Sequence, residues 1–546
     1  MKRLSFSRTR PWPRVTGVDP FRMGACPPGT CPHANTRSRG SVTVIVLLLT
    51  VVFAGLGLAM LHASGVHVMI NGFRRTSTLL DLASENGLKR GLVDLSAWLE
   101  AEALLAPVSA ESVEALREDP RRGFPPLVEE ALGSAFPRVL EESFDGMSWE
   151  SRADCGFGSL ADRGGYVRIT AAVRIESSGG LLRVRPRRVS TLEGSLGLLA
   201  GRLPLPAVPL YIKGDRTDPE KAAFAARNGI GLPAKPGQLL GAGLTTAAEG
   251  VLPDDAGGLA AKALAIGVFE PGDLSPALLR QALGLEASTD PVPDGIYLIE
   301  NDLGLGGVFV QGSLDEMILA VRGDSQVVVF RAGGADWRLE WSPARSRTEF
   351  LTPQGSRSYD LVPLPILFVN GAVAALGGGA VGMDGAVEMC SDGRTPAVLD
   401  GVDLTIVSAD RVTIASHLIL EGVRWQDGIP YSKDSEAHLV IYAAGRDAVT
   451  GERTEGGIAV AGEAPDGLKL QASLTAASGG FRIEGEARSV ELLGALHADA
   501  YAGNGSRMTL YRDDRAAAGE YPRYAPLTAE PQLAVYALKV LSWKEY

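Results

Sequence analysis

Cysteine is scarce in this sequence, with four residues among 546. Cys26 and Cys31 lie close to His33, but a zinc site usually needs four ligands in paired knuckles, and the sequence has no second pair of nearby cysteines. We therefore interpret this segment as part of a flexible tail. Cys155 and Cys390 could form a disulfide in an oxidising compartment, although they are far apart in the sequence and nothing local pairs them.

Aromatic residues and long apolar runs are also few. Aromatics make up 6% of the chain against 66 glycines, which favours many turns and short strands over helical bundles. Apolar residues account for 45% and charged residues for 21%, values close to the globular average that exclude a disordered chain. Beyond one N-terminal stretch, no run reaches 18 uncharged apolar residues, which excludes a multi-span membrane protein. The length exceeds that of one ordinary domain.

Charge is unevenly distributed along the chain. Residues 1–40 hold eight Lys or Arg and one acid, Asp19, whereas the whole chain carries a net charge of −11, so the remainder carries −18. We interpret residues 1–40 as a basic, disordered leader. The acidic remainder argues against nucleic acid as a partner, since phosphate contacts need clustered Lys or Arg.

The longest apolar stretch runs from Gly40 to Asn71 without Asp, Glu, Lys or Arg. Its core, Val42 to Leu61, is 20 residues long, and a helix of that length spans roughly 30 Å, the thickness of a bilayer's hydrocarbon core. This predicts a single membrane span. The basic leader before it and the acidic body after it predict a cytoplasmic N-terminus and an exported body.

The helical pattern continues beyond the span, because the sequence contains no proline from Gly40 until Pro107. Apolar residues recur at helical spacing and charged residues fill the other face, which predicts one helix over 41–106, apolar first and amphipathic second. The apolar positions are Leu79, Leu80, Ala83, Gly87, Leu88, Leu92, Leu95 and Leu99.

RGSVTVIVLLL followed by LDLASENGLKRGL, within Arg39 to Leu92, resembles the N-terminal segment of PilX-type pilus-assembly proteins. The resemblance implies a type IV pilin-like subunit of a bacterial inner membrane, with its body in the periplasm or at the cell surface and with other pilin-like or secretion-system subunits as partners. It also implies a leader-processing site between Gly40 and Ser41. Pilin precursors usually have Phe or Met after the cleaved Gly and Glu at the fifth mature position, where this chain has Ser41 and Ile45. A permanent single-pass anchor without a pilus role therefore remains an alternative.

Residues 107–212 predict a small α+β head. The sequence predicts helices up to about Gly146, with Ser109 as a cap and Pro120 as a break. Alternating residues after Tyr166 then predict a hairpin that turns at Gly179-Gly180. Residues 213–292 contain short helical runs separated by Gly and Pro, and we interpret them as a helical insertion or linker.

From residue 293 to 546 the sequence predicts short strands every 8 to 12 residues, as in a β-sandwich or a parallel β-solenoid. The sequence ILFVNGAVAALGG … LTIVSADRVTIASHLIL … HLVIYAAG … SWKEY resembles an uncharacterised β-solenoid domain found behind PilX-type anchors, and Trp543 matches its late Trp. That resemblance implies a right-handed β-helix-like fold. The fold class expected is thus α+β and predominantly β, with a long N-terminal helix, a small anchor-proximal sheet and a C-terminal solenoid.

Paired carboxylates are the main candidates for chemistry, because many β-helices cleave polysaccharides with acids grouped on one sheet face. Each candidate also has a structural interpretation as a turn or a solvated edge, and lone histidines beside apolar strands are usually packed residues. Asp513 and Asp514 could ligate calcium, but a turn is the simpler interpretation. The other candidates are Asp400 with Asp403, Asp410 with Arg411, Glu484 with Glu486, and His417, His438 and His497.

No catalytic, cofactor or metal site is predicted, and the expected function is that of a non-enzymatic, membrane-anchored, pilin-like structural protein. The alternative is a membrane-tethered surface protein that binds or processes envelope polysaccharide. It would need a groove of carboxylates and aromatic residues, for which Trp337, Trp341 and Trp425 are the candidates.

Overall fold

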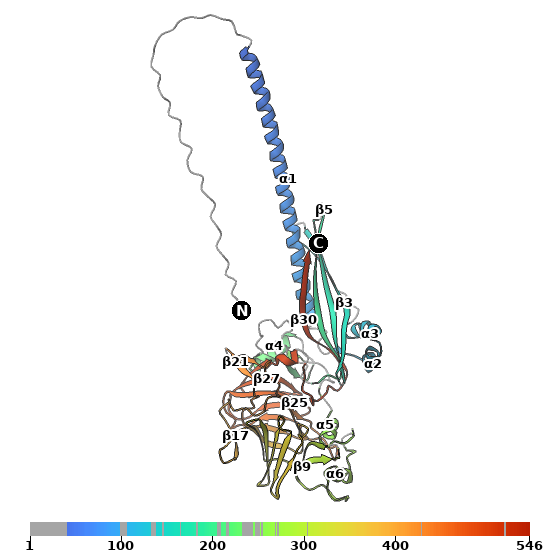
Figure 1. Ribbon diagram of the computed structural model, residues 1–546, viewed down its shortest axis with the longest axis vertical. Coiled ribbons are helices and arrows are strands. Elements are labelled where there is room, and N and C mark those ends of the chain that lie inside the picture. Colours follow the sequence, from blue (N-terminus) through green and yellow to red (C-terminus); the bar gives the residue numbers. More distant parts are fainter. Residues whose placement is uncertain are drawn as a thin grey trace, which may run out of the picture. The chain divides into compact units, whose positions relative to one another are not determined.

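The computed structural model is predominantly β, with 44% strand and 24% helix, and has one long apolar N-terminal helix (Figure 1). The chain divides into two compact units, Met1–Thr76 and Ser77–Tyr546. The structure describes residues 41–98, 106–132, 138–144, 147–163, 165–181, 184–204, 209–214, 218–231, 244–245, 252, 255–267, 269, 272–302, 304–426, 429–517 and 520–545. The leader, with Gly40, Cys26, Cys31 and His33, lies outside these residues.

Helix α1 (Ser41–Trp98) is 58 residues long and confirms the helix expected from the spacing, as far as the chain is described there. It contributes to both units. In the first unit its large apolar side chains are exposed as far as Phe73, except for the half-buried Val66. In the second unit Leu80, Leu88 and Leu95 are buried. The amphipathic part therefore packs on the rest of the second unit, whereas most described side chains of the uncharged part are exposed.

A six-stranded antiparallel sheet lies against the second half of α1, in the order β1-β30-β5-β4-β3-β2. Leu88 and Leu95 of the helix share a core with Val173, Ile175 and Leu192 of the sheet. The strands are β1 (Ala106–Pro107), β2 (Arg138–Phe144), β3 (Met147–Arg163), β4 (Tyr166–Leu181), β5 (Val184–Gly201) and β30 (Gln532–Glu545). Two helices, α2 (Ala110–Glu118) and α3 (Pro120–Leu132), add Leu116 and Leu127 to this core.

Two local predictions in this region are wrong. The segment expected to be helical around residues 138–144 is strand β2, because its backbone pairs with β3 and that pairing overrides helix propensity. Gly179 and Gly180, expected to form the hairpin turn, lie inside β4 opposite Arg188 and Arg187. The hairpin itself is confirmed by the pairing of β4 with β5. The Ser109 cap is also confirmed, since its side chain accepts a hydrogen bond from the Ser112 N–H at 3.1 Å.

The rest of the chain is inserted between two adjacent strands of this sheet. β5 ends at Gly201, and its neighbour β30 begins only at Gln532, close to the C-terminus. The strand pairing therefore assigns Gln532–Glu545, including Trp543, to the small sheet, whereas the sequence suggested one β-rich region from 293 to 546. A pairing between strands so far apart in the sequence leaves no local pattern that would predict it.

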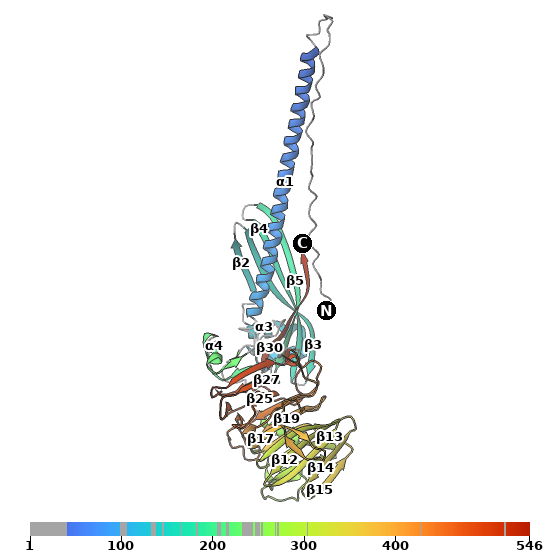
Figure 2. The ribbon, with the colours of Figure 1, turned by 90° about the vertical axis from the view of Figure 1, so that its left-hand side faces the viewer.

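The inserted body contains two eleven-stranded sheets. Its chain alternates between them, and each strand pairs in parallel with the strand of the next pass (Figure 2). In the first sheet these strands are β16 (Ile366–Asn370), β19 (Asp403–Ser408), β23 (His438–Ala443), β25 (Leu468–Ala476), β27 (Ser489–Ala498) and β29 (Arg507–Arg512). In the second sheet they are β17 (Val373–Val381), β20 (Val412–Ile414), β24 (Ile458–Val460), β26 (Phe481–Ile483) and β28 (Tyr501–Ala502).

One end of the body is antiparallel instead. In the second sheet a meander of consecutive antiparallel strands joins β17 through a parallel pair, and in the first sheet an antiparallel hairpin joins β16 through a parallel pair. The meander consists of β11 (Glu316–Arg322), β12 (Ser325–Ala332), β13 (Ala335–Ser342), β14 (Arg347–Thr352) and β15 (Gly355–Tyr359). The hairpin consists of β9 (Gly295–Asn301) and β10 (Gly304–Gln311). One hydrophobic core lies between the two sheets and includes Phe330, Leu367, Ile406 and Leu470.

Residues 213–292 contain three helices among the part described, in agreement with the expected helical character: α4 (Asp218–Arg227), α5 (Ala256–Ala263) and α6 (Pro276–Ala282). Ser275 caps α6 by accepting the Leu278 N–H, as the Ser-Pro start predicts. Helix α5 packs on Phe309 and Phe368 of the first sheet. Three short strands, β6 (Leu210–Ile212), β7 (Ile230–Gly231) and β8 (Leu244–Thr245), also join that sheet.

Candidate functional site

The first half of α1 is the part of the described chain that is most clearly built for an environment other than water. It is one helix long and apolar enough to cross a membrane, near the N-terminus, and fits a single-pass membrane protein. Phe73 is the last apolar side chain before Arg74 and is 74% exposed. Ser41, the expected first residue after processing, is also the first residue of the helix. Gly40 precedes the described residues.

The carboxylates Asp400 and Asp403 do not act as a pair. An oxygen of Asp400 accepts the backbone N–H of Glu436 at 2.7 Å and the hydroxyl of Ser435 at 3.3 Å. An oxygen of Asp403 lies 2.6 Å from Nδ1 of His438 on the adjacent strand β23. Asp400 therefore binds the next pass of the chain, and Asp403 lies beside a residue of that pass, which favours structural roles for both.

The second group of candidates forms a charge network across parallel strands. Asp410 accepts the backbone N–H of Glu455 at 3.0 Å. The guanidinium of Arg411 lies 2.6 Å from Glu484, and Arg482 bridges Glu455 and Glu484 at 3.1 and 3.0 Å. Glu484 is thus held by two arginines. Glu486, its expected partner, is exposed.

His417 and His497 both pack within the body. Nδ1 of His417 lies 2.9 Å from the backbone N of Lys469 and accepts its hydrogen, so the hydrogen bond from Nε2 to the Ser391 carbonyl at 3.1 Å makes this ring a neutral Nε2–H tautomer. Burial lowers the pKa of His417 below its usual value, against the opposing effect of the Ser391 hydrogen bond. His497 is buried, with its ring 6.5 Å from that of Tyr211.

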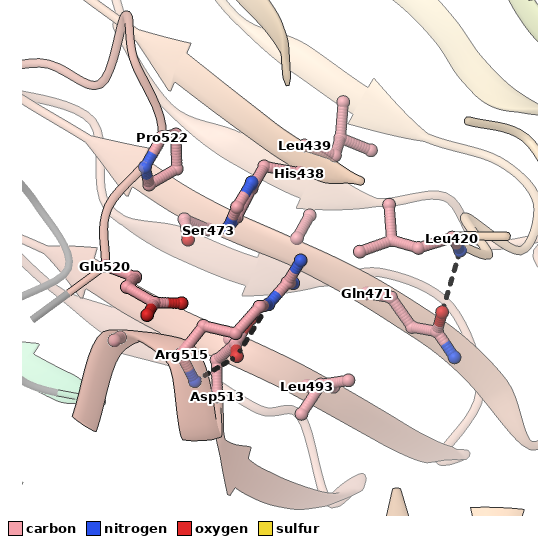
Figure 3. A pocket seen from close by; sticks show the side chains of 13 residues that line it. Leu420, His438, Leu439, Gln471, Ser473, Leu493, Asp513, Arg515, Glu520 and Pro522 are labelled. Atoms are coloured by element: carbon pink, nitrogen blue, oxygen red, sulfur yellow. Dashed lines mark hydrogen bonds and ion pairs between the residues drawn. The ribbon is translucent and has the colours of Figure 1, made fainter. Parts of the chain in front are cut away.

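A small hollow on the first sheet gathers several of the polar residues (Figure 3). It is shallow and partly open to solvent, and its polar lining includes His438, Gln471, Ser473, Asp513, Arg515 and Glu520. Arg515 is bound to Asp513 through two nitrogens, at 3.1 and 2.7 Å. It also donates to the carbonyls of Ser435 and Ala437 at 3.0 and 2.6 Å.

The charged groups of Arg515 and Asp513 in the hollow are therefore already bound to each other and to neighbouring protein groups. Asp513 also accepts the hydroxyl of Ser432 at 2.8 Å. Burial by itself would raise the pKa of Asp513, but the hydrogen bonds and charge of Arg515 keep that pKa below its usual value. With both oxygens of Asp513 engaged by Arg515, the calcium interpretation of Asp513 and Asp514 has no support here. Among the described residues, no group of three or more His, Cys, Asp or Glu side chains is arranged to hold a metal.

The three tryptophans proposed for sugar stacking do not line one common groove. Trp341 is buried in the core between the sheets, and Trp337 packs partly buried against the same core. Trp425 meets Tyr511 edge-on at 5.6 Å, and the ammonium of Lys469 lies 5.2 Å from the centre of its ring. The faces of these rings do not combine into one aromatic platform.

The disulfide considered between Cys155 and Cys390 is not formed, because Cys390 carries a free thiol. Its sulfur lies 3.8 Å from the hydroxyl of Thr395. Cys155 lies in β3 of the small sheet, and its side chain is outside the described part.

Sequence reasoning missed two buried glutamines that bind backbone groups of neighbouring segments. Gln326 accepts the N–H of Leu399 at 2.8 Å and donates to the carbonyls of Ala320 and Ala397 at 3.1 and 2.8 Å. Gln471 accepts the N–H of Leu420 at 2.7 Å. A glutamine inside an apolar strand was the available signal, since a buried amide needs hydrogen-bond partners.

No protein-family model matches this chain, and neither the search of curated proteins nor the search of solved structures gives a match.

Proposed function

We propose that this chain is a non-enzymatic, pilin-like structural subunit, anchored by α1 in a bacterial inner membrane and displaying its β-rich body outside that membrane. The observation that carries the proposal is that the two parts of one uninterrupted helix have different surroundings. Its first part is uncharged and exposed, and its second part covers an antiparallel sheet. A signal anchor alone needs the first part only.

Helix α1 and the small sheet approach each other closely, with glycines at points of close contact. A Cβ atom on Gly179 would lie 3.0 Å from the carbonyl oxygen of Leu80, and one on Gly91 would lie 3.2 Å from Ile175. The hydroxyl of Ser151 donates to the Gly87 carbonyl at 2.6 Å. Small residues on both partners therefore let the helix backbone approach the strands, which supports a fixed head on the helix rather than a flexible tether.

The body is, in this proposal, a right-handed β-helix-like solenoid. Its support is the parallel pairing between successive passes of the chain in both large sheets. The right-handed sense is the general preference for connections between parallel strands. The carboxylates on its surface bind neighbouring backbone groups and arginines, which supports a structural body over a hydrolytic one.

The experiment that tests the proposal determines the N-terminus of the full chain purified from membranes, by intact mass and N-terminal sequencing. We expect a mature protein that begins at Ser41, and we expect Gly40→Leu to retain the leader, whereas Gly24→Leu, a glycine elsewhere in the leader, leaves processing intact. A wild-type protein that keeps residues 1–40 would overturn the pilin-like assignment and favour a permanent anchor.

A further inference from the structure

Strand β15 (Gly355–Tyr359) forms one end of the second large sheet. On one side it pairs with β14, where Thr348 to Thr352 lie opposite Tyr359 to Gly355 without a register shift. On its other side no described strand pairs with it (Figure 2). Successive residues of a strand point their N–H and C=O groups to opposite sides, so about half of the backbone groups of β15 face this open edge.

The ends of the two large sheets differ in how well they are protected from association. Strands β7 and β28 have two residues each, and β9 packs against helix α6, since Ile299 and Leu279 share a core. Strand β15 has five residues, of which the first four are exposed. It contains no proline, no lysine and no β-bulge, which are common devices for blunting a sheet edge.

The core-facing side of β15 carries its one charged residue. Arg357 lies opposite the core residue Phe350 of β14, and Tyr359 lies opposite the buried residue Thr348. Opposed residues of an antiparallel pair share a face, so Arg357 and Tyr359 are on the same side of the strand. Tyr359 packs partly buried against the core, whereas Arg357 is exposed. A charge in this position opposes association unless the incoming strand offers it a favourable neighbour.

A second copy of β15 offers that neighbour in one antiparallel register. With a two-fold axis at Ser358, the two Ser358 residues lie opposite each other, and Arg357 of each copy lies opposite Tyr359 of the other. Each guanidinium can then lie over a tyrosine ring, so that the same cation–π contact is made twice. An axis at Arg357 would place two arginines opposite each other, which is destabilising. An axis at Tyr359 would place Arg357 opposite Leu361, which offers nothing to the charge.

We infer that β15 pairs with β15 of a second copy of this chain, antiparallel and about a two-fold axis at Ser358. Such an interface has to be self-complementary, and each copy supplies one arginine, one tyrosine and one open backbone edge. The pairing joins the second sheets of two bodies into one sheet. A strand of this length gives a weak contact by itself, so the inference rests on the proposed function for the membrane anchor, which raises the effective concentration of the two copies. It does not depend on cleavage at Ser41.

The test is disulfide trapping between two differently tagged full-length chains expressed together in membranes. One chain carries Arg357→Cys and the other carries Tyr359→Cys, which leaves the second arginine–tyrosine contact intact. The matched controls are the two self-pairs, in which both chains carry Arg357→Cys or both carry Tyr359→Cys. In all chains the native cysteines are first replaced by serine: Cys26, Cys31, Cys155 and Cys390.

We expect the mixed pair to give roughly tenfold more cross-linked dimer than either self-pair, because directly opposed residues are close enough for a disulfide and diagonal ones are not. If Tyr359→Cys does not fold, Ser358→Cys in both copies, joined by a short bismaleimide, tests the same axis. Equal trapping in the mixed pair and the self-pairs overturns the inference. So does a strongest product from Arg357→Cys with itself, which would indicate another register.

A further variant tests whether the trapped dimer depends on the open edge. Ser358→Lys in both chains places two like charges opposite each other at the axis, and we expect it to reduce trapping of the mixed pair to the level of the self-pairs. Gln354→Lys adds the same charge in the exposed turn before β15 and should leave trapping unchanged. Equal trapping with and without Ser358→Lys also overturns the inference. None of these results alters the outcome of the N-terminus experiment.

Discussion

Strand register is set in different ways in the small sheet and in the inserted body. In the small sheet, β2 to β5 follow one another as antiparallel hairpins, so short connections set the register. In the parallel part of the body, neighbouring strands are separated by a full pass of chain, and no tight turn links them. There, side chains bind the backbone of another pass: Asp400 accepts from Glu436, Ser408 donates to Gly371, and Asn370 accepts from Ala448.

This difference predicts which kind of substitution should destabilise each region. The body depends on buried polar side chains that fix one pass against another, so losing one such group leaves backbone groups unsatisfied. The small sheet depends on how closely α1 approaches it, so adding volume there should matter most. The predictions that follow run from the largest expected effect to the smallest.

Replacing Arg515 by methionine should produce the largest loss of stability in the body. The side chain is 5% exposed and binds Asp513 and two backbone carbonyls. Its removal leaves a buried carboxylate without its cation, which typically costs about 3–5 kcal/mol. The free energy of unfolding of the detergent-solubilised full chain, from denaturant titration, measures this.

The matched control is Arg345→Met. Arg345 is paired with Asp324 at 2.8 Å, but both side chains are well exposed. Exposed pairs contribute about 0–1 kcal/mol. Equal losses in the two variants would contradict a structural role for the buried pair.

Gln326→Leu tests whether the side chain of Gln326 holds one pass of the body in place against another. Leucine has a similar size but cannot accept the Leu399 N–H or donate to Ala320 and Ala397. We expect a loss of about 2–3 kcal/mol, the cost of buried backbone groups left unsatisfied. Hydrogen exchange of strand β12 and of residues 397–399 should increase. Gln354→Leu, in an exposed turn, should leave both measurements unchanged.

Much of the fold could be predicted from the sequence where the signal is local. The helix to Trp98, the Ser275 cap and the short strands after residue 293 all follow from spacing and capping residues. The pairing of β30 with β5 could not be predicted, because the partners lie at opposite ends of the insertion. Of the candidate side chains, the carboxylates were recognised but not their partners, since Asp403 and His438 meet only when two passes stack.

Gly179→Ala tests the close approach of α1 to the small sheet. The added Cβ would lie 3.0 Å from the Leu80 carbonyl oxygen and 3.1 Å from the Cβ of Ala83. Because the obstacle includes backbone, the helix has to shift, and we expect a loss of about 1–3 kcal/mol, as for other overpacked contacts. Limited proteolysis and hydrogen exchange of β4 and of residues 77–95 measure the loss.

Gly180→Ala provides the comparison on the neighbouring residue of the same strand. Its added Cβ would meet nothing closer than the hydroxyl of Ser148, at 3.7 Å, an ordinary contact. If both glycines tolerate alanine equally, close helix–sheet packing is not what holds this region together.

His417 gives the smallest predicted effect, a dependence on pH confined to the body. Burial lowers the pKa of His417 in the folded chain below the ordinary value of 6.5, so the unfolded chain binds a proton first as the pH falls. The stability that neutral His417 provides is therefore fully present above about pH 6.5 and declines as the pH falls below it, until the folded ring is protonated as well.

His417→Gln removes this titration while keeping a polar side chain near the Ser391 carbonyl and the Lys469 N–H. We expect the difference in unfolding free energy between wild type and variant to be constant from about pH 7 to 8.5 and to shrink as the pH falls toward about 5.5. Denaturant titrations across that range measure it. A difference that stays constant below pH 6.5 would mean that His417 titrates alike in the folded and unfolded chains, and that its two backbone hydrogen bonds do not fix the neutral ring.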